Sequence, residues 1–240
     1  AGAGHADGLG VAVDGSGNVH VTGSFRDTVN FGAGDVASAG NLDVSVTKLN
    51  SSGAHQWTTT FGGTGNDRAY VVAVDGSGNV YTTGYFSGTV DFGAGDVTSA
   101  GVDGFVTKLN SSGAHQWTTT LGGTSNDYGQ GVAVDGSGNV YTTGYFNGTV
   151  NFGAGNVTSA AGSDVFVTKL NSAGAHQWTT TLGGTDNDYG RGLAVDGSGN
   201  VYTTGQFNET VNFGAGDVTS AGNSDVFVVK LDSAGNATVT

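Results

Sequence analysis

The 240-residue chain contains no cysteine, no proline and no methionine. Without cysteine it has no disulfide framework, no thiolate metal ligand and no thiol nucleophile. Basic residues are also scarce: 7 lysines and arginines stand against 20 acidic residues, and the formal net charge is −13. A surface of this charge repels nucleic acid and anionic membranes, so we expect neither as a partner.

The chain lacks targeting and catalytic signatures as well. No apolar run approaches the ~18 residues that a membrane-spanning helix needs, so we predict no membrane insertion. No signal peptide and no initiator methionine are seen, which indicates a processed chain or an excised fragment. The motifs G-x-S-x-G, H-E-x-x-H and the P-loop lysine are absent, and Glu209 is the only glutamate. We therefore predict that the protein is not an enzyme.

Glycine is abundant, with 46 residues in the chain. Glycine at this frequency is often a sign of disorder, but hydrophobic residues make up 36% of the sequence and aromatic residues 10%. These residues recur at regular places, which disordered tracts do not show. The glycines therefore indicate many tight turns between short strands.

Four tandem copies of one unit account for this regularity. The string DGSGNV begins at Asp14, Asp75, Asp135 and Asp196, so the copies are 60 or 61 residues long. The string FGAG and the lysine of each V-K-L or T-K-L segment keep the same step. The copies divide the chain into blades at approximately 1–61, 62–121, 122–182 and 183–240.

Each copy is predicted to form four short strands. In the third copy, β-branched and aromatic residues bounded by Gly, Asn, Asp and Ser fall at 131–134, 140–146, 165–170 and 177–182. The third of these strands is apolar on both faces, as expected for a sheet that packs between two neighbours. The sequence therefore predicts an all-β fold: one β-propeller domain over residues 1–240, built from four-stranded antiparallel blades with the small Gly, Ala and Val strand innermost.

The same segments carry a family resemblance. GVAVDGSGNVYTTG, DVFVTKLN and the return WTTTLGGT-x-NDYG resemble the SBBP repeat, a β-propeller repeat of bacterial secreted and surface proteins. The resemblance implies an extracellular or cell-surface bacterial protein and carries no catalytic residues. Because that family is associated with more than four blades, three arrangements stay open: a closed four-blade ring, which we favour, half of a dimeric eight-blade ring, or a piece of a longer array.

The DGSGN turns are the first candidate ligand sites. Asp135, Ser137 and Asn139 place oxygens at the first, third and fifth positions, a spacing that calcium loops use. Thr143 stands at the ninth position, and no bidentate carboxylate follows. We therefore prefer a hairpin turn held by Asp and Asn, keep Ca²⁺ as the second interpretation and expect no other cofactor.

Two further groups are candidate ligand-binding residues. Tryptophans in the last strand of a blade could form an aromatic shelf for sugars, or could pack against the neighbouring blade. Asn-Asp pairs between blades could bind sugar hydroxyls or a cation, or could cap a turn through the backbone. In both groups packing and capping are the preferred interpretations. The candidates are Trp57, Trp117, Trp178, Asn126, Asp127, Asn187 and Asp188.

Near-identical copies favour architecture or multivalency over a single asymmetric active site. We predict a non-catalytic structural or adhesive module that contacts copies of itself or another surface protein. The alternative is a lectin-like propeller with one weak glycan site per blade. A hydrolase with an aspartate cluster at the propeller mouth is the least favoured interpretation.

Overall fold

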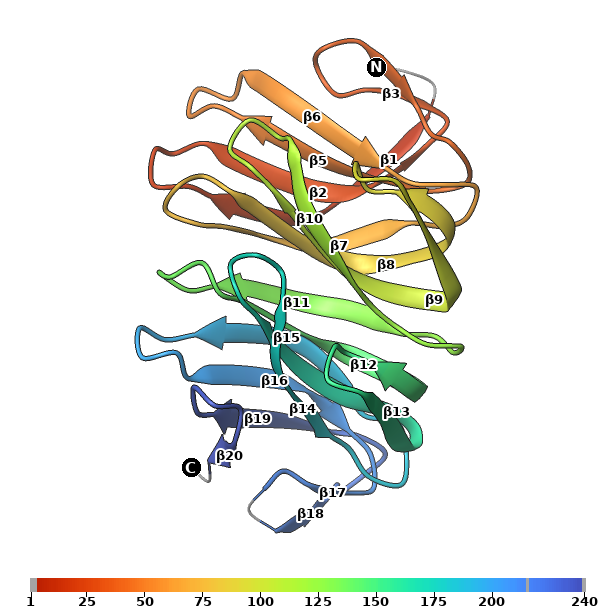
Figure 1. Cartoon of the computed structure of the whole chain (residues 1–240), viewed down its shortest axis with the longest axis vertical. Helices are drawn as coiled ribbons and strands as arrows, with labels where there is room; N and C mark the ends of the chain where they lie inside the picture. The colour runs from red at the N-terminus through yellow and green to blue at the C-terminus, as the bar shows by residue number, and fades with distance from the viewer. Residues whose placement is uncertain (1–3, 215, 239–240) are drawn as a thin grey trace.

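A computed structural model describes residues 4–214 and 216–238 of the chain. Each copy forms one four-stranded antiparallel sheet, and the four sheets stand side by side as the blades of a β-propeller (Figure 1). Within each sheet the four main strands follow one another in chain order. The predicted all-β propeller of four antiparallel blades is confirmed. The described residues contain no helix long and apolar enough to cross a membrane.

The strands of the first two blades have the following bounds. Blade 1 contains β1 (His5–Val13), β2 (Val19–Arg26), β5 (Asp43–Leu49) and β6 (His55–Phe61). Blade 2 contains β7 (Arg68–Val74), β8 (Val80–Asp91), β9 (Asp96–Leu109) and β10 (His115–Leu121).

The last two blades repeat this order. Blade 3 contains β11 (Tyr128–Val134), β12 (Val140–Asn151), β13 (Asn156–Leu170) and β14 (His176–Leu182). Blade 4 contains β15 (Tyr189–Val195), β16 (Val201–Phe207), β19 (Asp225–Leu231) and β20 (Ala237–Thr238). The small strands β1, β7, β11 and β15 contact one another in sequence, which is the inner position that the sequence predicts for them.

The middle strands are longer than predicted. In blades 2 and 3 they continue into a long hairpin through the segment between the two predicted strands, with a bulge at Gly88 and Gly148. Both glycines have a positive φ, which they adopt without steric cost. Blades 1 and 4 carry Asp27 and Glu209 at this position, also at positive φ. There the outer part forms separate hairpins, β3 (Thr28–Asn30) with β4 (Asp35–Ala37), and β17 (Thr210–Asn212) with β18 (Asp217–Thr219).

The hydrophobic cores lie between blades rather than inside them. One cluster joins Val44 and Val46 of blade 1 to residues of blade 2 such as Val72. A second joins blades 2 and 3, and a third joins blades 3 and 4. Each blade therefore contributes one face to the core before it and the other face to the core after it.

The closed four-blade ring favoured from the sequence is wrong for this structure. Blades 1 and 4 lie at opposite ends of the row, and so do the described ends of the chain (Figure 1). Valines on the outward faces of both end blades, such as Val11 and Val228, are exposed. Closure was expected because the four copies were taken as a complete set of blades. The sequence of a single repeat does not specify how many blades a propeller has.

Candidate binding surfaces

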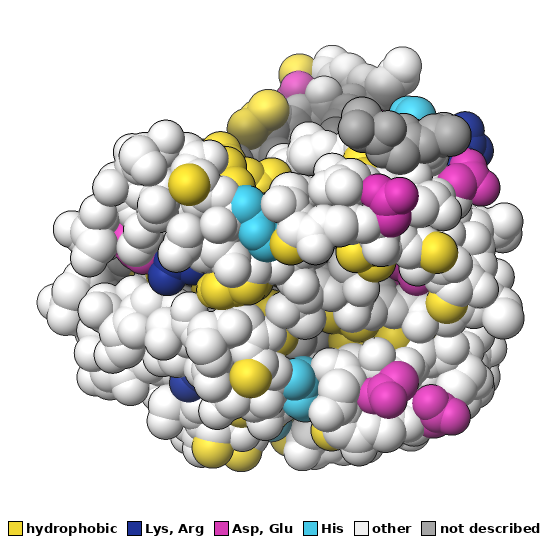
Figure 2. All heavy atoms as spheres, turned by 90° about the horizontal axis from the view of Figure 1, so that it is seen from above, with side chains coloured by type: hydrophobic (Ala, Val, Ile, Leu, Met, Phe, Trp, Pro, Cys, Tyr) yellow, Lys and Arg dark blue, Asp and Glu magenta, His cyan; other side chains and the backbone are white. Residues whose placement is uncertain are grey.

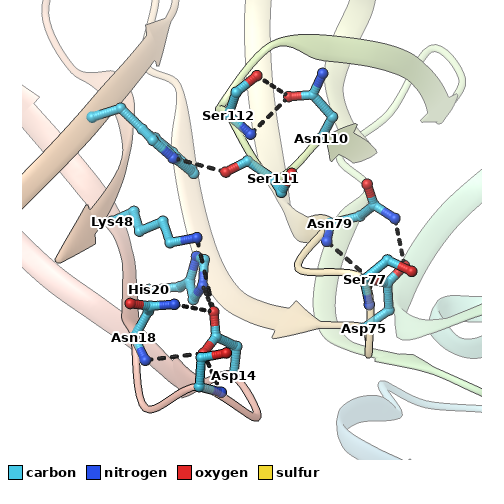
Figure 3. Close-up of polar contacts among 12 residues, drawn as sticks. Asp14, Asn18, His20, Lys48, Asp75, Ser77, Asn79, Asn110, Ser111 and Ser112 are labelled. Atoms are coloured by element: carbon cyan, nitrogen blue, oxygen red, sulfur yellow. Dashed lines mark hydrogen bonds and ion pairs between the residues drawn. The ribbon is translucent and has the colours of Figure 1, made fainter. Parts of the chain in front are cut away.

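The DGSGN turns use their aspartates to hold the hairpin. In blade 1, Oδ1 of Asp14 accepts hydrogen bonds from the backbone N–H groups of Ser16 and Asn18, each at 2.9 Å. Its Oδ2 accepts from Nδ2 of Asn18 at 2.7 Å (Figure 3). These bonds, the side-chain bond from Asn18 foremost, hold the pKa of Asp14 well below its ordinary value. The geometry agrees with the hairpin interpretation, and no cluster of metal-ligating residues occurs among the residues described.

The tryptophans contact the following blade. Nε1 of Trp57 donates to the carbonyl oxygen of Ser111 in blade 2 at 3.2 Å, and Figure 3 shows Ser111 and its turn facing blade 1. The indole also lies against Gly113, where a Cβ would come within 2.8 Å of the ring. Trp117 and Trp178 donate in the same way, to Ser172 and Ser233. This is the packing role that the sequence favours, and a ligand-binding role for the tryptophans stays a prediction.

The aspartates of the Asn-Asp pairs are buried and cap the backbone. Asp127 accepts hydrogen bonds from the amides of Gly123 at 2.8 Å and Asn147 at 3.0 Å. Its own amide donates to the carbonyl of Val102 in blade 2 at 2.7 Å. Burial raises the pKa of Asp127 to about 6 despite the two amide donors. Asp188 makes the equivalent bonds. In both pairs the carboxylate therefore holds the segment that connects two blades, and the backbone amide of the same residue bonds to the preceding blade.

A row of half-buried tyrosines runs across blades 2 to 4. Its ring centroids are 5.1 Å apart for Tyr85 and Tyr128, 4.9 Å for Tyr128 and Tyr145, and 4.7 Å for Tyr145 and Tyr189. Burial and neighbouring tyrosines raise the pKa of Tyr145 to about 12, so its hydroxyl keeps its proton. The row therefore presents aromatic surface together with the neutral hydroxyl of Tyr145.

A hollow of about 480 Å³ opens beside this row, between blades 3 and 4. Three tyrosines line it together with amide and hydroxyl side chains. Of the predicted site residues, Asn126 lines the hollow. Asn187 instead uses its side-chain oxygen to accept from the amide of Ser163 at 3.1 Å. The lining residues are Ser125, Asn126, Tyr128, Tyr145, Asn147, Ser163 and Tyr189.

Between blades 1 and 2 the equivalent hollow is charged. It measures about 350 Å³ and contains Arg26 and Asn66. Asp7 and Arg68 stand where blade 3 has Tyr128, and they form an ion pair at 3.0 Å. The charged hollow between blades 1 and 2 therefore differs from the tyrosine hollow in chemistry, although both occupy the same place in the repeat.

The two ends of the row expose apolar sheet faces. On blade 1, which we call the N-face, Leu9, Val11 and Val13 of β1 are exposed. On blade 4, the C-face exposes Val226 and Val228 of β19 together with Tyr202 of β16. Figure 2 looks onto the molecule from the blade 1 end and shows hydrophobic side chains around a recess. Exposed apolar patches of this kind mark interaction surfaces.

The sequence did not identify the tyrosine row or the two apolar faces. A signal for the row was present, because Tyr128 opens the first strand of blade 3 and Tyr145 is its partner across the strand pair. The faces could not be found from residue type alone. Val226 and Val165 occupy equivalent positions in near-identical strands, and only the presence of a following blade distinguishes them.

Comparison with known proteins agrees with the repeat. Residues 56–85, 116–150 and 177–208 match the family model described as SBBP: beta-propeller repeat. The regulatory protein FlaEY of Caulobacter vibrioides is 28% identical over 95% of this chain. An uncharacterized WD repeat-containing protein, L264, of Acanthamoeba polyphaga mimivirus is 25% identical over 78% of it. This chain spans 26% and 17% of the lengths of these two relatives.

A solved structure from Bacteroides caccae, of a protein of unknown function, also aligns with the chain. The alignment covers 97% of this chain and 80% of the other, with a TM-score of 0.42 and 9% sequence identity.

Proposed function

Because three segments of this chain match the SBBP beta-propeller repeat, we propose that it is a non-catalytic protein-binding module of an extracellular or cell-surface protein. Its contact surfaces are the N-face and the C-face, and it requires no cofactor. The observation that carries the proposal is the exposure of valines at both ends of the row, such as Val11 and Val228. Burying such side chains against a partner releases roughly 25 cal/mol for each Å² of apolar surface removed from water.

Site-specific photocrosslinking tests this proposal. A photoreactive phenylalanine analogue placed at Val11 or Val228 in the full chain, in cells that naturally make it, is expected to form protein adducts. Peptide mass spectrometry then identifies the partner and its contact site. Val218 provides a matched control, because it is an exposed valine on the separate β17–β18 hairpin. If neither face yields more adduct than Val218, the proposed function is wrong.

The tyrosine hollow supports a second candidate function, weak glycan binding. Sugars bind where an aromatic ring supplies an apolar surface and nearby amides and hydroxyls supply hydrogen bonds. Tyr145, Tyr189 and Asn126 provide these groups in one hollow. The guanidinium of Arg191 lies 5.1 Å from the ring centroid of Tyr189 and braces that ring.

A glycan array with paired variants tests this second candidate. Asn126→Ala and Tyr145→Ala are expected to weaken glycan binding by roughly tenfold, which corresponds to about 1.4 kcal/mol. Asn66→Ala is the control, since Asn66 occupies the same position of the repeat as Asn126 but lines the charged hollow, which it enters from the following blade. Equal losses in Asn126→Ala and Asn66→Ala would place any glycan site elsewhere than the tyrosine hollow.

A further inference from the structure

The C-face is the same surface that each preceding blade buries. Val226 and Val228 of blade 4 are 77% and 69% exposed. The residues at the same positions in blade 3, Val165 and Val167, are 0% exposed because blade 4 covers them. Tyr202 follows the same rule: it is 37% exposed, whereas Tyr141 at the equivalent position in blade 3 is 0% exposed.

The N-face is the other half of that interface. Val11 of β1 is 67% exposed. At the same position, Val72 of β7 and Val132 of β11 are each 6% exposed, because the preceding blade covers them. Three cores of this kind lie inside the chain, and the N-face and C-face are the two separated halves of a fourth.

We propose that blade 4 of one chain binds blade 1 of a second copy, head to tail, and so rebuilds the core that is missing from a single chain. This inference rests on the proposed function, since it names the partner of the same two faces. Each junction inside the chain pairs a face equivalent to the C-face with a face equivalent to the N-face, and a second copy presents the required N-face. The pairing is therefore already present three times in the fold.

Such a contact joins two different surfaces, so it is heterologous. It leaves one N-face and one C-face free in a pair of copies. These free faces either meet, which closes a ring, or bind further copies, which extends an array. The alternative of two identical faces packing together would give a dimer with no free face of that type, and this difference makes the proposal testable.

The fit at the new junction differs in detail from the junctions inside the chain. Ser45 of blade 1 stands where blades 2 to 4 carry phenylalanine, and an apolar-lined hollow of about 270 Å³ lies there beside Phe31 and Leu49. Val21 replaces the threonine of the other blades, so Thr204 of a docked copy would face a methyl group rather than a hydroxyl. Because of the hollow, we expect a weaker contact than the junctions within the chain.

Charge opposes assembly at long range. Each chain carries a formal net charge of −13, so two copies repel each other in dilute buffer. Salt screens this repulsion, with a Debye length of about 8 Å at physiological ionic strength. Assembly through apolar faces is therefore expected to strengthen as the salt concentration rises, whereas assembly through ion pairs would weaken.

The first test is the mass of the 240-residue chain in solution. Sedimentation equilibrium over a wide concentration range is expected to show dimers or larger assemblies that increase with salt. Either a dimer or a growing array supports assembly through the end faces, and the variants below decide whether unlike faces meet. A chain that stays monomeric at every concentration and salt level overturns the inference.

Two variants then test which faces meet. Val11→Lys and Val228→Lys each bury an unpaired charge in the proposed contact, so each is expected to weaken assembly by roughly a hundredfold. Lysine also lowers the net negative charge, so a loss of assembly cannot come from greater overall repulsion. Both positions are exposed in the single chain, and unchanged circular dichroism and melting temperature check the fold. Val218→Lys is the control and is expected to assemble normally.

Mixing the two variants is the decisive step. The intact C-face of Val11→Lys can bind the intact N-face of Val228→Lys, so the mixture is expected to form a one-to-one complex that grows no further. If Val228→Lys assembles on its own, or if mixing restores nothing, the head-to-tail contact is wrong.

The outcomes separate this inference from the proposed function. If the chain stays monomeric while photocrosslinking at Val228 captures a different protein, the two faces bind a partner that is not a second copy. If crosslinks at Val11 and Val228 join the two faces of two copies, both proposals stand. If no adduct forms, the proposed function fails as well.

Discussion

Replacing Gly144 with alanine is expected to lower the free energy of unfolding by about 3 kcal/mol, the upper part of the range for overpacking. Gly144 is buried in β12, opposite the bulge where β11 shifts register. A Cβ there would overlap the carbonyl oxygen of Tyr128 and approach a ring carbon of Phe166. Because the first obstacle is backbone, the two strands would have to separate. Gly23, Gly84 and Gly205 have the same relation to their own blades.

Gly136 provides the matched control for this substitution. It lies in the DGSGN turn of the same blade, where an added Cβ meets no atom within 4 Å. Gly136→Ala is expected to change the free energy of unfolding by less than about 1 kcal/mol. Denaturant unfolding followed by tryptophan fluorescence measures both variants, and equal effects at the two positions would show that the close approach at Gly144 relaxes without cost.

The second large effect is a rise in stability as the pH falls from about 7 to about 5. Burial raises the folded-state pKa of Asp67, Asp127 and Asp188 to about 6, from an ordinary value of 3.8. Between these values the folded chain takes up protons that the unfolded chain does not, so acidification favours folding. Each of these three carboxyls therefore lowers the free energy of unfolding while it is ionised, and protonation removes that cost.

The turn aspartates set the acid limit of this rise. Hydrogen bonds in the turns lower the pKa values of Asp14 and Asp196, among others, below the ordinary value. Such groups stabilise the fold above the unfolded pKa and lose that contribution as the pH falls through the folded pKa. Stability is therefore expected to pass through a maximum between about pH 4 and pH 5 and to fall at more acid pH.

Calorimetric melting at constant ionic strength measures this profile. Asp127→Asn removes one of the three titrating groups, so the melting temperature should rise less on acidification than in the unmodified chain. Asparagine has only one acceptor oxygen for the two amides, so the substitution also changes the absolute stability. The informative quantity is therefore the slope of the melting temperature against pH. Burial lowers the pKa values of His20, His115 and His176, which opposes the rise, so the comparison of slopes is the test: equal slopes for Asp127→Asn and the unmodified chain would contradict the raised pKa of Asp127.

The repeat made the fold predictable. The strings at Asp14, Asp75, Asp135 and Asp196 placed a hairpin turn in every copy, and the structure has one at each position. Strand ends were harder to place, because the continuation of β12 beyond Phe146 depends on a bulge at Gly148 rather than on hydrophobic alternation. Local composition indicates where a strand starts more clearly than where it ends, because its length depends on pairing with the neighbouring strand.

The binding surfaces were less predictable than the fold. Tryptophan was the residue type most easily associated with sugars, but Trp117 donates its indole N–H to the next blade. Tyrosine was predicted as a strand former and as a neighbour of the tryptophan shelf, but not as a row of its own, although Tyr128 and Tyr145 meet across blade 3 beside the hollow. Which aromatic residues stay free depends on contacts between blades, 55 residues apart in sequence for Trp117 and Ser172, and no short motif encodes them.

The sequential strand order within each sheet has a consequence for synthesis on the ribosome. Each blade is built from strands of a single copy. Its hydrogen bonds can therefore form as soon as that copy has emerged from the ribosome. Folding can then proceed in the order of translation, domains being able to fold as units during synthesis. At each step the newest blade exposes the face that Val226 and Val228 expose on blade 4, until the next blade covers it. The growing chain would therefore present one recurring apolar surface to chaperones or to neighbouring nascent chains on the same messenger RNA.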